Sequence, residues 1–135
     1  MGMQMAKNIA FFSDGTWNGP GQDENADGVP DVTNVLKLYN EVVGNIALTT
    51  LRLENEQEKV LADPDGVEMQ VAKYIHGVGD SGNALIKLLG GTFGAGIVQR
   101  IVRGYTFVSR NYDPGDQIFL VGFSRGAYTA RALAG

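Results

Sequence analysis

The sequence has 135 residues, of which 44% are hydrophobic and 19% are charged, a balance typical of a globular domain with a buried core. The formal net charge is −4 and the 11 Lys and Arg residues are scattered along the chain, so we predict no nucleic-acid partner. The absence of cysteine excludes disulfide bonds and thiolate metal sites.

The N-terminal segment lacks the pattern of a secretory signal peptide, because the apolar run from Ile9 to Phe12 is short and no small-residue cleavage site follows it. The uncharged segment at residues 88–98 has about half the length that a membrane-spanning helix needs. We therefore expect no transmembrane helix and a cytoplasmic location in the cell that makes the protein.

Three strand patterns alternate with three helical patterns along the chain. The predicted strands are residues 7–13, 69–75 and 117–121, and the predicted helices are residues 32–43, 97–108 and 125–134. The second predicted helix, residues 97–108, is amphipathic. Its expected apolar face contains Ile97, Val98, Ile101, Val102, Tyr105 and Val108, and Arg100, Arg103 and Arg110 lie opposite.

This alternation favours parallel strand pairing through right-handed crossovers, with helices on both faces of the sheet. We predict a three-layer α/β fold around a parallel sheet, in one domain over residues 1–135. Residues 45–66 do not fit the alternation: residues 46–53 are compatible with a strand and residues 55–61 with a charged helical turn. We interpret 45–66 as a surface insertion. Function is expected at the carboxyl ends of the strands.

The segment Gly122-Phe123-Ser124-Arg125-Gly126 matches G-x-S-x-G, a pattern in which a nucleophilic serine occupies a strained turn between a strand and a helix. A strand is predicted before this segment and a short Ala-rich helix after it, which is the context that the pattern requires. A serine that merely caps a helix between packing glycines is the alternative. We predict Ser124 as the nucleophile.

A serine nucleophile of this kind needs two backbone N–H groups that stabilise the oxyanion. One is expected from Arg125, and the other from Gly15 or Thr16 in the loop after the first strand, with Asp14 or Asn18 orienting that loop. An ordinary Asp-Gly turn is the alternative for this loop. The order of oxyanion strand, crossover strand and nucleophile strand is that of an α/β-hydrolase sheet, here its N-terminal part.

Five segments of the sequence, in order, resemble the type VI secretion phospholipase effector family. They are residues 11–18 (FFSDGTWN), 33–39 (TNVLKLY), 77–79 (GVG), 112–116 (YDPGD) and 122–131 (GFSRGAYTAR). The resemblance implies an α/β-hydrolase with Ser124 as nucleophile and phospholipase A activity on a lipid ester. It also implies action at a membrane surface, delivery by type VI secretion, and a secretion apparatus or an immunity protein as partners.

The family's catalytic Asp and His lie downstream of the nucleophile, and residues 45–66 match no part of the family pattern. His76 is the only histidine in the sequence and so the only candidate base within it. It precedes Ser124, whereas the usual order is Ser, then Asp or Glu, then His. We therefore interpret His76 as a polar residue at a strand end, and we predict that this chain alone has little activity.

Residues 23–31 space oxygen ligands in the manner of a calcium loop, through Asp23, Asn25, Asp27 and Asp31. Asn34 stands where the loop would need a bidentate Glu, which favours a solvated acidic loop. We predict no metal and no cofactor. The functional prediction is a serine ester hydrolase of phospholipase type. The alternative is a non-catalytic fragment that binds a partner through an open sheet edge.

Overall fold

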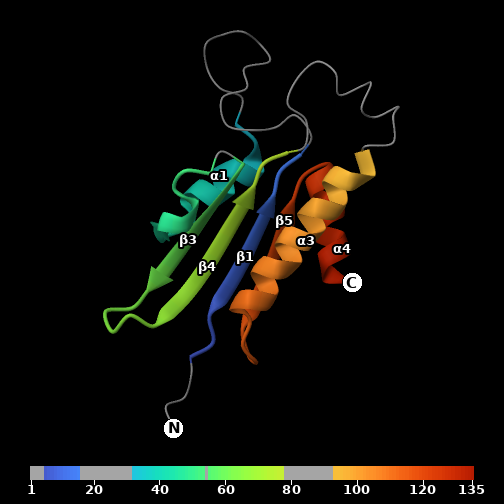
Figure 1. The fold of residues 1–135 in the computed structure, drawn as a ribbon. Coiled ribbons are helices and arrows are strands. Elements are labelled where there is room, and N and C mark those ends of the chain that lie inside the picture. The colour runs from blue at the N-terminus through green and yellow to red at the C-terminus, as the bar shows by residue number, and fades with distance from the viewer. Residues whose placement is uncertain (1–4, 16–31, 54, 78–92) are drawn as a thin grey trace.

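The computed structural model describes residues 5–15, 32–53, 55–77 and 93–135, with side chains in the last range described from residue 96 onwards (Figure 1). Its elements are β1 (Asn8–Ser13), α1 (Asn34–Glu41), β2 (Asn45–Ile46), the short 3₁₀ helix η1 (Leu48–Thr50), β3 (Glu56–Ala62), β4 (Glu68–Ile75), α3 (Phe93–Asn111), β5 (Gln117–Gly122) and α4 (Arg125–Ala134). No helix in these ranges is long and apolar enough to cross a membrane.

The strands form one sheet in the order β2-β3-β4-β1-β5. β1 lies between β4 and β5 and is parallel to both. β3 is antiparallel to β4, and β2 is antiparallel to β3. The prediction of an α/β fold is confirmed, but the prediction of a parallel sheet is wrong, because the sheet is mixed.

A tight turn between β3 and β4 is the physical reason for the antiparallel pairing, since so short a connection cannot return the chain to a parallel strand. The Asp63 carboxylate accepts hydrogen bonds from the backbone N–H groups of Asp65 (2.9 Å) and Val67 (2.8 Å). Gly66 supplies the left-handed conformation of the turn, with φ 82°.

Residues 45–66, which we interpreted as a surface insertion, carry β2, η1 and β3 and so extend the sheet. Residues 46–53 do not form a strand, because only Asn45–Ile46 pair with β3 and a 3₁₀ turn follows. The charged segment expected to be a helical turn is β3, whose seven residues pair along β4.

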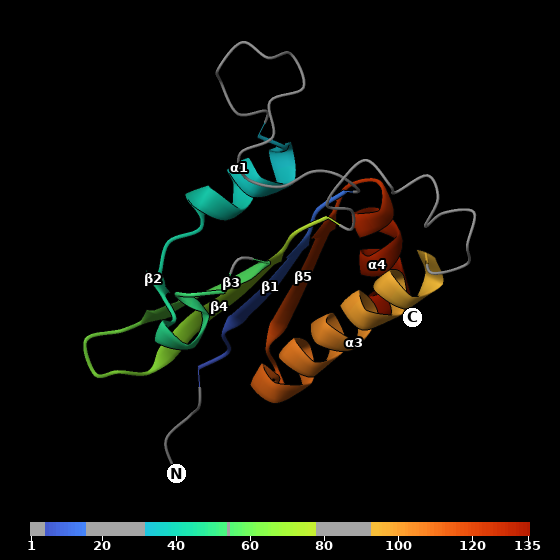
Figure 2. The same ribbon diagram turned by 45° about the horizontal axis from the view of Figure 1, so that its top comes forward.

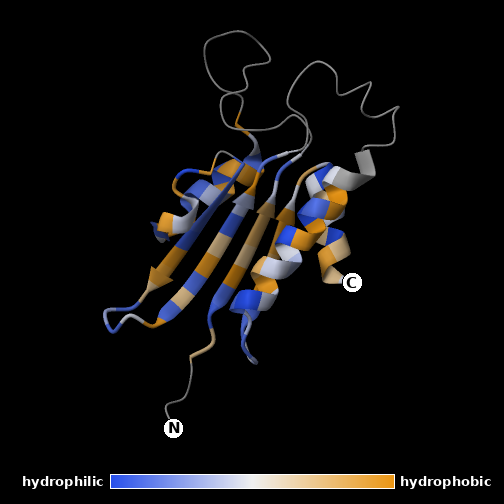
Figure 3. Cartoon of the chain, in the orientation of Figure 1, coloured by the Kyte–Doolittle hydropathy of each residue, from blue (hydrophilic) through white to orange (hydrophobic). Residues whose placement is uncertain are grey.

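Helices cover both faces of the sheet, with α1 on one face and α3 and α4 on the other (Figures 1 and 2). β1 is hydrophobic over most of its length (Figure 3) and contributes alternate side chains to two cores. The α1 core contains Ala10, Phe12, Val35, Leu36, Tyr39, Ala72 and Tyr74. The core beneath α3 contains Ile9, Phe11, Val71, Ile75 and Phe107.

The face of α3 that meets the sheet differs from the predicted one. Arg100, Gly104 and Phe107 are buried, whereas Val98, Val102 and Tyr105 are exposed. Gly104 explains the rotation, because a Cβ there would lie 2.5 Å from Leu133 Cδ1 and 3.0 Å from Phe11 Cζ. The helix makes its closest approach through this glycine, and Arg100, one turn earlier on the same face, is carried inwards.

Candidate active site

Ser124 occupies a sharp turn between β5, which ends at Gly122, and α4, which begins at Arg125. Its backbone has φ 55° and ψ −122°, and among the described residues it is the one non-glycine residue with positive φ. Such a conformation costs about 1–3 kcal/mol and persists only where the surroundings enforce it. Ser124 is exposed at the carboxyl end of β5, in the turn where the sequence predicted it.

The two glycines of the motif are required by close backbone packing. A Cβ on Gly122 would overlap the carbonyl of Gly126, and a Cβ on Gly126 would overlap the carbonyl of Ser13. The first turn of α4 therefore rests directly on the ends of β5 and β1. This contact leaves no room for any side chain at positions 122 and 126, and it holds Ser124 in its strained conformation.

Backbone hydrogen bonds fix the same turn. The Phe123 N–H donates to the Ser13 carbonyl (3.2 Å), and the Gly126 N–H donates to the Phe123 carbonyl (2.8 Å). The Ala127 N–H donates to the Ser124 carbonyl (3.0 Å), which begins the helix. The N-terminus of α4, where a helix dipole favours negative charge, thus adjoins Ser124.

Asp14 is fully buried at the end of β1, and its carboxylate accepts three hydrogen bonds. Oδ1 accepts from the Gly15 N–H (2.8 Å), while Oδ2 accepts from Thr33 Oγ1 (2.7 Å) and from the Tyr74 hydroxyl (2.6 Å). These donors compensate for the removal of the charge from water. Thr33 also caps α1, because its Oγ1 accepts from the Leu36 N–H (3.1 Å).

The Tyr74 hydroxyl is held in its protonated form. Burial raises its pKa well above the usual range, and the hydrogen bond to Asp14 raises it further. Tyr74 is therefore a permanent donor to Asp14 at physiological pH, and the carboxylate joins β1, β4 and the start of α1 at the carboxyl end of β1. The sequence indicated Asp14 or Asn18 as the residue that orients the loop after β1, and it did not indicate Thr33 or Tyr74 as partners of Asp14.

Gly15 lies directly against Ser124. A Cβ on Gly15 would be 3.1 Å from Ser124 Cβ and 2.8 Å from Phe123 Cδ1. The cause is the parallel pairing of β1 with β5, which places Ser13 opposite Gly122. The structure therefore brings together Asp14, Gly15, Ser124 and Arg125, whereas Thr16 and Asn18 lie outside the described residues.

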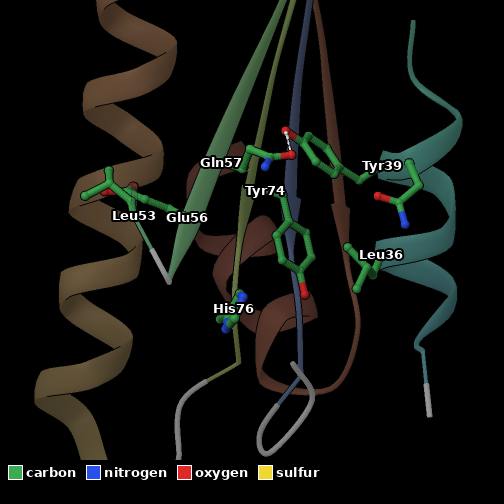
Figure 4. Close-up of a pocket in the computed structure, with 8 residues that line it drawn as sticks. Leu36, Tyr39, Leu53, Glu56, Gln57, Tyr74 and His76 are labelled. Atoms are coloured by element: carbon green, nitrogen blue, oxygen red, sulfur yellow. Dashed lines mark hydrogen bonds between the residues drawn. The ribbon is translucent and has the colours of Figure 1, made fainter. Parts of the chain in front are cut away.

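His76 lies at the end of β4, two strands from Ser124, because Ile75 pairs with Ser13 and Ser13 with Gly122. Two strand spacings correspond to about 10 Å. Its ring packs edge-on against that of Tyr74 at 5.5 Å and faces a pocket of about 280 Å³ (Figure 4). The pocket is lined by Leu36, Tyr39, Asn40, Leu53, Glu56, Gln57, Tyr74 and His76. The structure does not bring His76 beside the serine.

A second pocket, of about 450 Å³, adjoins the Ser124 turn on the α1 face of the sheet. It is lined by Val32, Thr33, Asn34, Val35, Leu38, Val121, Gly122 and Phe123. Most of these side chains are apolar, and Phe123 directly precedes the serine. We call this pocket the apolar groove.

The residues of the predicted calcium loop, Asp23, Asn25, Asp27 and Asp31, lie outside the described part of the chain. Within the described part, no group of three or more His, Asp and Glu side chains is arranged to hold a metal ion.

Comparison with known proteins identifies the family. The model of the type VI secretion system phospholipase effector family, Tle1-like catalytic domain, matches residues 7–135. The chain belongs to this family. The resemblance predicted from the five sequence segments is therefore confirmed.

The Tle1-like chain is also similar to the uncharacterized protein YEL023C of Saccharomyces cerevisiae, with 32% identity over 142 residues. The match covers 96% of the chain and 17% of the yeast protein. The chain thus spans about a sixth of the length of the curated relative that it matches. No solved structure matches it significantly.

Proposed function

We propose that this chain supplies the nucleophile and part of the oxyanion site of a phospholipase A-type serine ester hydrolase. The observation that carries the proposal is the strained, exposed turn of Ser124 between β5 and the N-terminus of α4. A serine in this conformation presents its hydroxyl away from the sheet, with backbone N–H groups of the following helix close by. The family assignment supports a phospholipid ester as the substrate class.

In the proposed reaction Ser124 Oγ attacks the carbonyl carbon of the acyl ester while a general base takes the hydroxyl proton. The resulting oxyanion accepts a hydrogen bond from the backbone N–H of Arg125. The tetrahedral intermediate then releases the alcohol, which receives the proton, and leaves an acyl-serine. Water hydrolyses the acyl-serine to a fatty acid and regenerates Ser124.

The loop after β1 is proposed to supply the second oxyanion donor. Gly15 is in contact with Ser124, but its N–H is directed at Asp14 Oδ1. Of the two candidates, Thr16 is therefore the better donor in our proposal. Asp14 acts in this scheme as a positioning residue, because its carboxylate holds the N–H of Gly15, the residue directly before Thr16 in the sequence.

The general base is proposed to be a histidine downstream of Ser124, with an Asp partner, as in the resembling family. His76 lies two strands away, and its ring faces a different pocket. The 135-residue chain alone is accordingly expected to turn over esters very slowly, because loss of a triad member costs about 10⁴- to 10⁶-fold in turnover.

The apolar groove supports a lipid substrate. Its volume of about 450 Å³ lies within the usual range of ligand pockets, and its lining is mainly apolar. It reaches the serine through Phe123 and Gly122. We propose that the acyl chain of the substrate lies in this groove while its ester carbonyl meets Ser124.

The test is hydrolysis of phospholipid vesicles and of a short-chain ester by the full-length protein, meaning this chain together with the proposed downstream Asp and His. The same assays are run on its Ser124→Ala variant. Ser109→Ala, which removes an exposed serine from α3, is the matched control. We expect Ser124→Ala to abolish hydrolysis of both substrates and Ser109→Ala to retain it. Full activity in Ser124→Ala would refute Ser124 as the nucleophile. No hydrolysis by the unmodified protein would favour the non-catalytic alternative, a binding module that uses β5, an edge strand of the described sheet, where Ile118 and Phe119 are exposed.

A further inference from the structure

The peptide group that joins Asp14 to Gly15 is held at both of its polar ends. Its N–H, which belongs to Gly15, donates to Asp14 Oδ1 at 2.8 Å. Its carbonyl, which belongs to Asp14, accepts from Arg100 Nη1 at 3.4 Å. The N–H and the carbonyl of a trans peptide point in opposite directions from one rigid plane. The two contacts therefore oppose any rotation of this plane about the chain.

The same peptide borders the Ser124 turn. A Cβ on Gly15 would lie 3.1 Å from Ser124 Cβ, and a Cβ on Gly126 would lie 2.6 Å from the Asp14 carbonyl oxygen. The peptide thus lies against both Ser124 and the first turn of α4. Rotation of its plane changes the backbone dihedrals of Asp14 and Gly15, and so the direction in which the chain continues to Thr16, the proposed second oxyanion donor.

Arg100 is buried on α3, with 8% of its surface exposed. In the described part of the chain no carboxylate lies within 4.0 Å of its guanidinium group, whereas the buried side chains of Lys7 and Lys73 each pair with two carboxylates. Burial lowers the pKa of Arg100 to about 10, and the Asp14 carboxylate opposes the lowering, so the guanidinium is charged at physiological pH. A buried cation without an anion at contact distance is costly, and such groups are concentrated at functional sites.

The charges of Asp14 and Arg100 favour one orientation of the peptide. The N–H is the positive end of the peptide dipole and faces the carboxylate, while the carbonyl is the negative end and faces the guanidinium. A reversed peptide would direct its carbonyl at the carboxylate and its N–H at the guanidinium, so both contacts would be repulsive. A distance of 3.4 Å is long for a hydrogen bond, but the attraction between a charge and a dipole is strong where little water screens it.

The packing of α3 explains how Arg100 reaches the end of β1. The helix comes closest to Phe11 at Gly104, and Arg100 lies one turn earlier on the same face. Asp14 lies three residues after Phe11, a distance of about 10 Å along a strand. One helical turn covers about 5 Å of this distance, and the long side chain of arginine spans the rest.

We propose that Arg100 is a positioning residue for ester hydrolysis, which fixes the Asp14–Gly15 peptide and thereby the oxyanion donor that follows it. The inference rests on the proposed function and adds to it a residue of α3 that touches no reacting atom. Arg100 acts on the carbonyl of the peptide, and the Asp14 carboxylate acts on its N–H. Loss of the Arg100 contact leaves the peptide free to rotate and moves the oxyanion donor out of place.

The experiment measures hydrolysis of a short-chain ester by the full-length protein and by three variants of α3. Arg100→Met removes the charge and the donors, Arg100→Lys keeps a positive charge and a donor, and Arg103→Met is the control, because Arg103 is exposed on the same helix. The affinity of an alkyl trifluoromethyl ketone is measured as well. Its carbonyl carbon bonds to Ser124 Oγ, whose proton passes to the general base, and its oxygen becomes an oxyanion. Urea unfolding shows whether each variant is folded.

We expect Arg100→Met to lower kcat by about tenfold while KM changes less than about twofold, because the displaced donor is needed only when the oxyanion forms. The affinity for the ketone should fall by the same factor. Arg100→Lys should keep kcat within about threefold of the unmodified protein, and Arg103→Met should leave kcat unchanged. If Arg100→Met does not fold, Arg100→Gln, which is shorter and uncharged, takes its place with the same expected losses.

Several results would overturn the inference. A loss of kcat in Arg100→Met with full affinity for the ketone would show that the effect does not pass through the oxyanion donors. An equal loss in Arg103→Met, or in Arg100→Lys, would show that the contact of Arg100 with the peptide is not its cause. If Arg100→Met hydrolyses the ester normally while Ser124→Ala is inactive, the inference fails and the proposed function stands. Persistent hydrolysis in Ser124→Ala refutes the proposed function itself.

Discussion

Replacement of Tyr74 by Phe tests the buried network that supports the candidate oxyanion loop. The change removes one hydroxyl and leaves the ring in the α1 core, where Tyr74 packs against Tyr39 at a centroid distance of 5.4 Å. Asp14 would keep its hydrogen bonds from Gly15 and Thr33 but lose the 2.6 Å bond from Tyr74. A fully buried carboxylate would then lack one of its three donors.

The expected destabilisation is about 1.5–3 kcal/mol, the range for a hydrogen bond to a charged group. It should appear as a lower midpoint of urea unfolding with an unchanged m-value. Because the Gly15 peptide is held by the same carboxylate, kcat on a short-chain ester should also fall while KM changes little. Tyr105→Phe is the matched control, since Tyr105 is 67% exposed on α3.

Two results would refute this reasoning. Ordinary surface changes alter the free energy of unfolding by up to about 0.5 kcal/mol. If Tyr74→Phe changes it by no more than that, the hydroxyl does not stabilise Asp14. A loss of kcat that Tyr105→Phe reproduces would show that the effect does not pass through the Asp14 network.

Three other predictions concern packing, capping and pH. Gly126→Ala should destabilise the protein by about 1–3 kcal/mol or more in urea unfolding and abolish hydrolysis, because the added methyl group would overlap the Ser13 carbonyl. Unchanged stability would contradict the packing described. Lys59→Met should lower the free energy of unfolding by about 1–2 kcal/mol, because Lys59 Nζ donates to the carbonyls of Tyr39, Asn40 and Val42 at the end of α1. The control Lys37→Met, on the exposed face of α1, should leave the free energy of unfolding nearly unchanged. The hydrogen bond from the Lys7 side chain, joined by one from its backbone, lowers the pKa of Asp116 to about 2. The stability from this group is therefore present above about pH 4 and is lost as the pH falls towards 2, so urea midpoints should drop over that range more steeply in the unmodified protein than in Asp116→Asn.

The sequence predicted the central part of the fold because its signals there are local. β1, β4 and β5 are apolar segments bounded by turn residues, and α4 follows a motif whose flanking glycines have a packing reason. The contact of Gly15 with Ser124 also followed from strand order alone, since β1 and β5 are neighbours in the sheet.

The sequence could not predict β3, because its pattern is charged and its burial depends on distant partners. Glu58 is buried in this strand, where its carboxylate accepts from Lys73 Nζ (2.9 Å) and from Arg110 Nη2 (2.8 Å). Those partners lie 15 and 52 residues away, so no local pattern shows the pairing. Read alone, the segment has the composition of an exposed helical turn.

The orientation of α3 and the partners of Asp14 have the same kind of cause. Gly104 turns a less apolar face of α3 towards the sheet because it contacts Leu133 and Phe11. Tyr74 reaches Asp14 from 60 residues away. Thr33 gave a partial signal, because a threonine before an apolar helical run is typical of an N-cap, but its bond to Asp14 depends on the position of α1.

The central claim is that Ser124 is the nucleophile, and covalent labelling tests it most directly. The full-length protein is treated with a fluorophosphonate, digested, and analysed by mass spectrometry to find the modified residue. A single adduct on Ser124, formed in parallel with loss of ester hydrolysis, is the predicted result. Loss of hydrolysis with the adduct on another residue and an unmodified Ser124 would contradict the claim.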